Sequence, residues 1–472
     1  MNDPVLAHLE TEKPAIVERL LDLVRIPSVS TDPSYKQGMA QAREVLSQRL
    51  RHMGLANVQT LEAGGHPALY GEWLAAAAKP TLMVYGHYDV QPPDPLEQWH
   101  SPPFEPEVRD SRIYGRGVSD DKGPSSIALE TIAAFLRIEG GLPFNLRVLL
   151  EGEEELGSPT LGAILRDHRE LLAVDAVISA DGARWRLDLV TVNIGSRGNA
   201  GFEFTVRTAA KDLHSGRYGG VVANALHVMA ELVAALHAPD GSVAVPGFYE
   251  GASDISPTER EVLASIPFDE ESLFDAIGAK PVGEPGHTTL ERLWLRPCLD
   301  VNGMWGGYTG PGGKTVIPHE AHAKVTVRLI PGQDPDRISQ SVKDFLVSKC
   351  PAGCGISFGA DRGQSAAYEV PLDHPLLHAV EAALTQVHGL APLRVRVGGT
   401  LPMSDIVHRE LGVDTVMFSF SIADEDFHAP NEFFRLSSID DGVQAWTALF
   451  RRLGETSARD FAAFHHRSGT AR

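Results

Sequence analysis

The feature that most constrains the fold is an alternation between short apolar segments and amphipathic helical segments. Four apolar runs of strand length are Thr81 to Tyr85, Leu146 to Leu150, Ala176 to Ser179 and Thr415 to Ser419. Three helices are predicted at Pro14 to Val24, Met39 to Met53 and Pro124 to Ile138. Continuous apolar strands that alternate with helices are typical of a mostly parallel sheet flanked by helices. We therefore predict an α/β domain with a doubly wound sheet.

A different pattern begins near Gly198 and ends near Val370. Apolar and polar residues alternate from Phe202 to Arg207 and again from Ala321 to Leu329, as expected of a sheet with one solvated face. A helix is predicted between these strands, and the earlier pattern then returns with a helix at Pro375 to Val387. We expect an inserted α+β domain at 198–369, within an α/β domain formed by 1–197 and 370–472.

The composition limits the partners and the compartment. A chain of 472 residues with 43% hydrophobic residues is long enough for two domains, and its formal charge of -20 disfavours nucleic acid and anionic membranes. Three cysteines are too few for a disulfide framework. The first residues do not resemble a signal peptide, and no segment has the roughly 18 apolar residues of a membrane span. We therefore expect a cytoplasmic protein with no membrane partner.

Side chains that bind metals follow each predicted strand. They are His87 and Asp89 after the first, Glu153 to Glu155 after the second, Asp181 after the third and His428 beyond the fourth. Asp120 and Asp121 precede the Pro124 helix. Because ligands collect at the carboxyl ends of strands in an open α/β sheet, we expect these residues at one edge. Mixed imidazole and carboxylate donors suit zinc, manganese or cobalt better than calcium or magnesium.

Such a cluster has the components needed for hydrolysis. Two divalent ions lower the pKa of a water that they share and stabilise the charge that develops on a carbonyl oxygen. The proton of that water must pass to a carboxylate that binds no metal. Side chains alternate along an extended segment, so either Glu153 or Glu155 could be a ligand while its neighbour is the base. Asp89 is placed to accept the second imidazole N–H of His87.

Several motifs together resemble those of the dinuclear metallopeptidases. This group includes carnosinase-like dipeptidases, carboxypeptidase G-like enzymes, aminoacylases, acetylornithine deacetylase and succinyl-diaminopimelate desuccinylase. The resemblance spans nearly the whole chain and is closest to the carnosinase-like branch. The segments that carry it are Gly86 to Pro92, Trp99 to Phe104, Gly115 to Gly123, Glu153 to Ser158, Asp212 to Gly216 and Phe427 to Glu432.

The resemblance implies a role for each residue at the predicted sheet edge. Asp120 would bridge two divalent ions per subunit, for which we expect Zn²⁺, with Mn²⁺ or Co²⁺ as alternatives. Glu154 would be the general base. The remaining metal ligands that the resemblance implies are His87, Glu155, Asp181 and His428.

The inserted domain resembles the family's lid and dimerisation domain. The resemblance implies that His214 reaches across a homodimer to the substrate carbonyl, where an imidazole N–H stabilises an oxyanion. It also implies that Arg328 binds the substrate carboxylate, to which a planar guanidinium is suited. Thr315 and Thr400 would hydrogen-bond the bound dipeptide. The segment Thr400-Leu401-Pro402 departs from the Ser-Ile-Pro of many relatives, which bears on side-chain preference.

We therefore predict a metal-dependent hydrolase that cleaves dipeptides or small peptides with a free C-terminal carboxylate. The alternative is an N-acyl amino acid deacylase of the deacetylase or desuccinylase type, which would use the same metals and base. A non-catalytic relative is disfavoured because all five ligand positions and the base are present.

Overall fold

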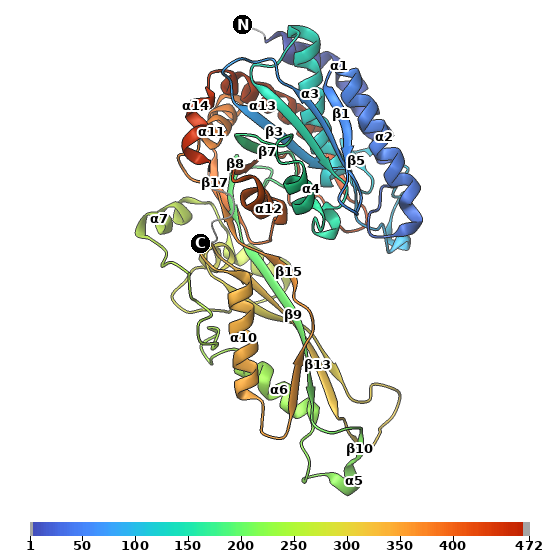
Figure 1. Cartoon of the computed structure of the whole chain (residues 1–472), viewed down its shortest axis with the longest axis vertical. Helices are drawn as coiled ribbons and strands as arrows, with labels where there is room; N and C mark the ends of the chain where they lie inside the picture. Colours follow the sequence, from blue (N-terminus) through green and yellow to red (C-terminus); the bar gives the residue numbers. More distant parts are fainter. Residues whose placement is uncertain (1–2, 466–472) are drawn as a thin grey trace. The chain divides into compact units, whose positions relative to one another are not determined.

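The computed structural model describes residues 3–465, which divide into two compact units (Figure 1). The first contains residues up to 194, 370–395 and those from 403 onward, and the second contains 195–369 and 396–402. Residues 195–197 and 396–402 were predicted to belong to the α/β domain but lie in the second unit. Hydrogen bonds join these two segments to each other and to β13 (Glu320–Leu329): Arg197 Nε donates to Gly398 O at 2.8 Å, and Arg328 Nη1 donates to Thr400 Oγ1 at 2.8 Å.

The first unit is built on a six-stranded mixed sheet with the order β1-β2-β6-β3-β7-β18. The pairs β6–β3, β3–β7 and β7–β18 are parallel, whereas β1–β2 and β2–β6 are antiparallel. The four predicted strands are present, and the fourth ends at Met417 rather than at Ser419. The strand bounds are β1 Ala56–Leu61, β2 Ala68–Trp73, β3 Thr81–His87, β6 Asn145–Glu151, β7 Ala176–Ser179 and β18 Thr415–Met417.

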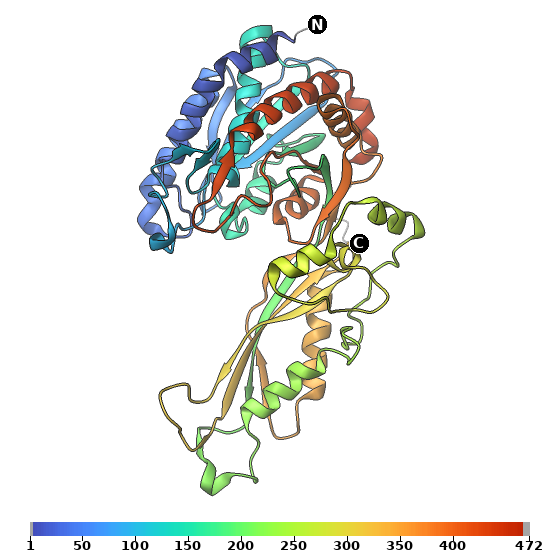
Figure 2. The same cartoon turned by 180° about the vertical axis from the view of Figure 1, so that it is seen from behind.

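Helices cover both faces of this sheet, as Figures 1 and 2 show from opposite sides. On one face, Met83 and Tyr85 of β3 share a core with α4 (Leu161–Asp167) and α12 (Pro402–Leu411). On the other, α3 (Gly123–Glu139) contacts β3 and packs against α1 (Pro4–Val24) and α13 (Leu436–Gly454). Helix α2 (Lys36–His52) contacts β1 and β2, and α11 (Pro375–His388) contacts α13. The predicted doubly wound α/β arrangement is therefore confirmed.

Helix α1 begins earlier than predicted. It starts at Pro4, where the side chain of Asp3 accepts hydrogen bonds from the N–H groups of Val5 and Leu6 and so caps the helix. Pro14, the predicted first residue, lies inside the helix on its exposed side. A proline is favoured in the first turn of a helix, and Pro4 occupies that position.

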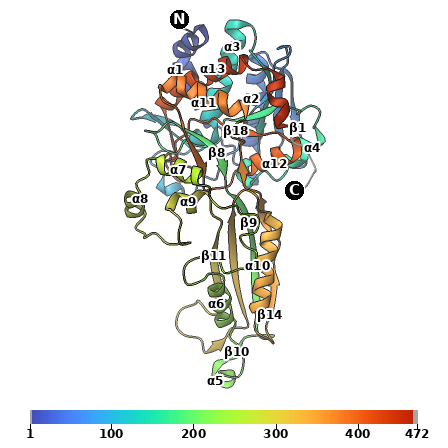
Figure 3. The same cartoon turned by 90° about the vertical axis from the view of Figure 1, so that its left-hand side faces the viewer.

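The second unit contains an antiparallel sheet with the order β11-β13-β9-β14, and β15 also pairs with β9 (Figure 3). Helices α6 (Ala225–Ala235) and α10 (Pro335–Lys349) pack on the apolar residues of β9 and β13. The α+β prediction for this region is therefore confirmed. No helix within residues 3–465 is both long and apolar enough to cross a membrane. The strand bounds are β9 Gly198–Arg207, β11 Cys298–Gly306, β13 Glu320–Leu329, β14 Gly355–Phe358 and β15 Arg362–Ser365.

Candidate metal centre and active site

The predicted ligands meet because neighbouring parallel strands end at the same edge of the sheet. His87 is the last residue of β3 and lies opposite Glu151, the last residue of β6. Strand β7 ends at Ser179, opposite Tyr85, so Asp181 follows at the same edge. Loops after these strands therefore deliver their side chains to one place.

Two groups of three side chains are arranged as metal ligands, and Asp120 belongs to both. In each group, one nitrogen or oxygen atom per residue lies within 4.8 Å of the others. Asp120 Oδ1 is 3.1 Å from Nε2 of His87, and Asp120 Oδ2 is 3.0 Å from Nε2 of His428. Asp181 completes the first group and Glu155 the second. The peptide bond between Asp120 and Asp121 is cis.

The pKa values of several of these side chains are shifted because their carboxylates lie close together where little water reaches them. Burial raises the pKa of Asp181 to about 6. Burial and then the charge of Asp181 raise the pKa of Glu154 well above its usual range. Hydrogen bonds with Asp120 and Glu155 raise the pKa of His428 to about 10. Buried negative charge of this kind must be compensated, and nitrogen and oxygen donors in these groups suit divalent transition metals. The donor set therefore fits metal ions.

Contacts of the ring nitrogen Nδ1 with Asp89 fix the orientation of the His87 imidazole. Nδ1 lies 3.0 Å from the backbone oxygen of Asp89 and 3.4 Å from the carboxylate oxygen Oδ1 of the same residue. Because these oxygens can only accept a hydrogen bond, Nδ1 carries a proton, and Nε2 is the ring nitrogen that faces Asp120. The expected imidazole partner is thus Asp89, through its carbonyl as well as its carboxylate.

The carboxylate of Asp89 also holds the glutamate loop. Its two oxygens accept hydrogen bonds from the N–H groups of Glu154 and Glu155, at 3.2 and 3.1 Å. The side chain of Glu153 points elsewhere: it accepts from the N–H of His66 at 2.9 Å and from Thr160 Oγ1 at 2.5 Å. By contrast, Glu155 Oε2 lies 3.2 Å from Nε2 of His428. Glu155, and not Glu153, is therefore adjacent to the other candidate ligands.

Glu432, for which no role was predicted, anchors the loop that carries Asp120. Its fully buried carboxylate accepts from Arg116 Nη1 at 2.8 Å and from the N–H groups of Gly117, Ser119 and Asp120 at 2.8, 2.9 and 3.1 Å. Four donors on one carboxylate fix the path of the loop. The motif that contains His428 ends at Glu432, and this was the only signal for it in the sequence.

The four residues predicted to bind substrate form two pairs within the second unit. His214 and Thr315 are adjacent because β10 (Leu213–His214) pairs with β12 (Val316–Ile317) and Ser215 N donates to Thr315 O at 3.1 Å. Arg328 and Thr400 are hydrogen-bonded to each other. The first pair lies beyond the Glu320 end of β13, whereas Arg328 is near the other end. Strand β10 lies below β13 in Figure 1.

The length of β13 sets the separation of these pairs. Glu320 and Arg328 are about 8 residues apart, which at roughly 3.3 Å per residue corresponds to roughly 26 Å. An extended dipeptide spans only about 7 Å. The second unit of a single chain therefore cannot bring both pairs to the same dipeptide.

We predict that the substitution Glu432→Gln weakens binding of Zn²⁺ about 10- to 100-fold, the usual effect of losing a residue that orients metal ligands. In the native protein four donors share the two carboxylate oxygens of Glu432. The neutral amide of glutamine has only one oxygen acceptor for the same four donors. Competition with a chromophoric chelator measures the affinity, and circular dichroism checks the fold. Glu105→Gln, at an exposed position, is the matched control. Unchanged affinity in a folded Glu432→Gln protein would contradict the anchoring role.

Comparisons with known proteins agree with this geometry. A Cys-Gly metallodipeptidase of Schizosaccharomyces pombe is 27% identical over 472 residues, covering 96% of this chain and 99% of the relative. The Beta-Ala-His dipeptidase of Homo sapiens is 25% identical over 472 residues, covering 96% of this chain and 93% of the relative.

Solved structures of related enzymes have the same fold. The dipeptidase Dug1p of Saccharomyces cerevisiae has a TM-score of 0.80 and 25% identity, over 96% of this chain and 98% of that one. An M20 family metallo-carboxypeptidase from Sulfolobus solfataricus has a TM-score of 0.82 and 28% identity, over 93% of this chain and 99% of that one. Residues 83–452 match the peptidase family M20/M25/M40. This chain, an enzyme of the metallopeptidase class, belongs to that family.

Proposed function

We propose that this protein hydrolyses the amide bond of dipeptides or small peptides that have a free C-terminal carboxylate. The observation that carries the proposal is the shared position of Asp120 in two ligand groups, with the half-buried Glu154 close enough for the charge of Asp181 to raise its pKa. Relatives named as dipeptidases and as a carboxypeptidase support this substrate class. They do not favour the alternative of an N-acyl amino acid deacylase.

Five side chains would hold two divalent cations, for which we propose Zn²⁺, with Mn²⁺ or Co²⁺ as alternatives. His87 and Asp181 would bind one ion, Glu155 and His428 the other, and Asp120 both. When bound, the ions supply Lewis acidity that lowers the pKa of a water and polarises the carbonyl of the substrate. The proton on Nδ1 of His87 leaves Nε2 free to be the ligand atom.

We propose Glu154 as the general base. Its carboxylate would take a proton from the attacking water, and the resulting carboxylic acid would give that proton to the leaving nitrogen. Burial beside Asp181 raises the pKa of Glu154 and so makes the carboxylate a better proton acceptor. Asp89 would act as a positioning residue, since it fixes both the imidazole of His87 and the N–H groups of the glutamate loop.

The second unit would supply the contacts that select the substrate. Arg328 would bind the free carboxylate, and its hydrogen bond to Thr400 Oγ1 orients the guanidinium. Nδ1 of His214 accepts a hydrogen bond from the N–H of Gly216 at 3.0 Å, so the neutral ring carries its proton on Nε2. That N–H is free to donate to the oxyanion of the tetrahedral intermediate, and Thr315 would hydrogen-bond the peptide beside it.

The separation of the two pairs supports a homodimer. If one chain cannot bring both pairs to a dipeptide, His214 and Thr315 of the partner subunit would complete the site that contains Arg328. We also propose a cytoplasmic location. The three cysteines form no disulfide, which agrees with a reducing compartment.

Hydrolysis of a substrate panel tests the function. We expect metal-stripped protein to be inactive and to regain cleavage of free dipeptides when Zn²⁺, Mn²⁺ or Co²⁺ is added. C-terminally amidated dipeptides should be poor substrates because they lack the charge that Arg328 binds. Release of free amino acids, followed by chromatography, is the measurement. Cleavage of N-acetyl or N-succinyl amino acids alone would assign the protein to the deacylases.

The base is tested by Glu154→Gln, which we expect to lower kcat about 10²- to 10⁴-fold, the contribution typical of general base catalysis. Binding of Zn²⁺ should be retained, since this carboxylate belongs to neither ligand group. Steady-state kinetics and metal titration measure the two effects. Glu153→Gln is the matched control and should retain most activity, because its side chain contacts His66 and Thr160 instead of the metal centre. A fully active Glu154→Gln enzyme would refute the assignment.

Subunit mixing tests the contribution of His214 to the neighbouring site. Glu154→Gln and His214→Ala should each be inactive as homodimers. When equal amounts of the two variants are dissociated and reassociate at random, half of the dimers are hybrids. If His214 acts across the dimer, one of the two active sites in each hybrid has both an intact Glu154 and an intact His214. We therefore expect about a quarter of the wild-type specific activity if His214 acts across the dimer. No recovery in a mixture shown to contain hybrids would mean that His214 acts within its own subunit.

A further inference from the structure

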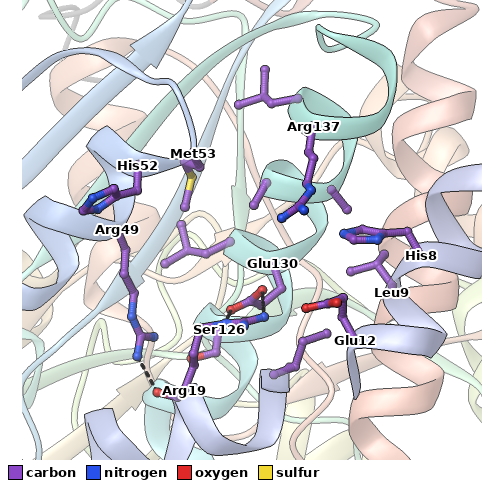
Figure 4. A pocket seen from close by; sticks show the side chains of 15 residues that line it. His8, Leu9, Glu12, Arg19, Arg49, His52, Met53, Ser126, Glu130 and Arg137 are labelled. Carbon is purple, nitrogen blue, oxygen red and sulfur yellow. Dashed lines mark hydrogen bonds and ion pairs between the residues drawn. The ribbon is translucent and has the colours of Figure 1, made fainter. Parts of the chain in front are cut away.

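A cavity of about 640 Å³ lies in the first unit among helices α1, α2 and α3 (Figure 4). Its volume is within the range of small-molecule sites in proteins. None of the candidate metal ligands or the base is among the residues that line it. Apolar side chains form a large part of the wall, namely Leu9, Ile16, Met53, Leu129, Ala133 and Leu136. The cavity can therefore accept a hydrocarbon group.

Arg137 lines the cavity as an exposed, solvated side chain, and among the less exposed charged side chains one positive and one negative have no ionic partner. Arg19 and Glu130 neutralise each other, because Nε and Nη2 of Arg19 donate to the two carboxylate oxygens at 2.7 and 2.6 Å. Arg49 donates from Nη2 to the backbone oxygen of Arg19, and within residues 3–465 no carboxylate lies at ion-pair distance from it. Within the same residues, no cationic side chain lies at ion-pair distance from Glu12. The wall thus presents an unpaired guanidinium and an unpaired carboxylate.

A buried hydroxyl at the wall also lacks a partner. Ser126 is 4% exposed, and its Oγ has no hydrogen-bond partner among the described residues. A serine inside a helix commonly donates to the carbonyl one turn earlier, and Ser126 does not. A buried polar atom left unpaired is costly, so such an atom beside a cavity indicates a ligand that would satisfy it.

We propose that this cavity is a second binding site, for a free α-amino acid with an apolar side chain. The carboxylate of the ligand would bind Arg49 and Ser126 Oγ, and its ammonium would bind Glu12. The side chain would lie on the apolar wall. A hydrocarbon without charges would leave Arg49 and Glu12 unpaired, and an anion alone would leave Glu12 unpaired. The zwitterion matches all three features of the wall.

Two methionines allow the site to be tested in the Zn²⁺-loaded enzyme. Met53 lines the cavity, and Met417 Sδ lies 3.4 Å from the point that a Cβ atom would occupy if Gly182, the residue after Asp181, had a side chain. The ¹³C-methyl resonance of Met53 therefore reports on the cavity, and that of Met417 reports on the metal centre. Substitution of each methionine by leucine assigns the two resonances.

We expect L-leucine to shift the Met53 resonance in a saturable manner. 4-Methylpentanoate, which lacks the ammonium group, and 3-methylbutylamine, which lacks the carboxylate, should bind at least about tenfold more weakly, as each loses a charge-assisted hydrogen bond. Neither compound has an amide bond, so the readout is independent of hydrolysis and of the proposed function. A shift of Met417 alone would place leucine at the metal centre and overturn the proposal. Equal binding of 4-methylpentanoate would overturn the zwitterion assignment.

Substitutions locate the two charges. Arg49→Gln and Glu12→Gln should each weaken binding of L-leucine at least about tenfold. The exposed neighbours on the same helices provide the matched controls Arg51→Gln and Glu10→Gln, which should leave binding unchanged. Glu12 forms no ion pair in the described part of the chain, so its substitution tests the site with little effect on folding. Unchanged binding in folded Glu12→Gln and Arg49→Gln proteins would refute the site.

Discussion

The metal centre depends on the compensation of buried negative charge. Asp120, Glu154, Glu155 and Asp181 converge at one sheet edge where little water reaches them. An isolated carboxylate in such a place costs several kcal/mol, and it would normally be protonated instead. Only nearby cations allow these groups to remain charged. The parallel strands end at one edge and so bring these carboxylates together. The imidazoles of two histidines complete the set of donors that would bind the cations.

Rigid loops are needed if charges that repel one another are to be held as ligands. Glu432 and Asp89 meet this need in the same way, since each buried carboxylate accepts hydrogen bonds from successive backbone N–H groups. Glu432 holds the loop of Asp120, and Asp89 holds that of Glu154 and Glu155. The backbone N–H groups of irregular loops need hydrogen-bond acceptors. Here the two carboxylates are those acceptors, and they thereby fix the loops that carry the candidate ligands. We therefore expect substitution of either carboxylate to act on the candidate metal centre through the backbone.

The sequence allowed prediction of the parallel strands and of the polar residues after them, because long apolar runs and strand ends have clear local signatures. Alternation could not distinguish Glu153 from Glu155, since Glu154–Leu156 forms a 3₁₀ turn rather than an extended segment. The role of Glu432 was not predictable because its partners are mainly peptide N–H groups far away in the chain. Strands β1 and β2 were missed as well: β1 is mostly exposed and lacks an apolar run.

If His214 and Arg328 contact one substrate, as we propose, the length of β13 makes a complete site depend on a second subunit. His214 and Arg328 belong to the same unit, and their separation is fixed by β13, which pairs with β9 along its full length. Motion between the two units leaves that separation unchanged, because both residues would move together. Bending the sheet enough to bring both to one dipeptide would break its backbone ladder and its packing against α6 and α10. Supply of His214 by a second copy of the chain requires neither change.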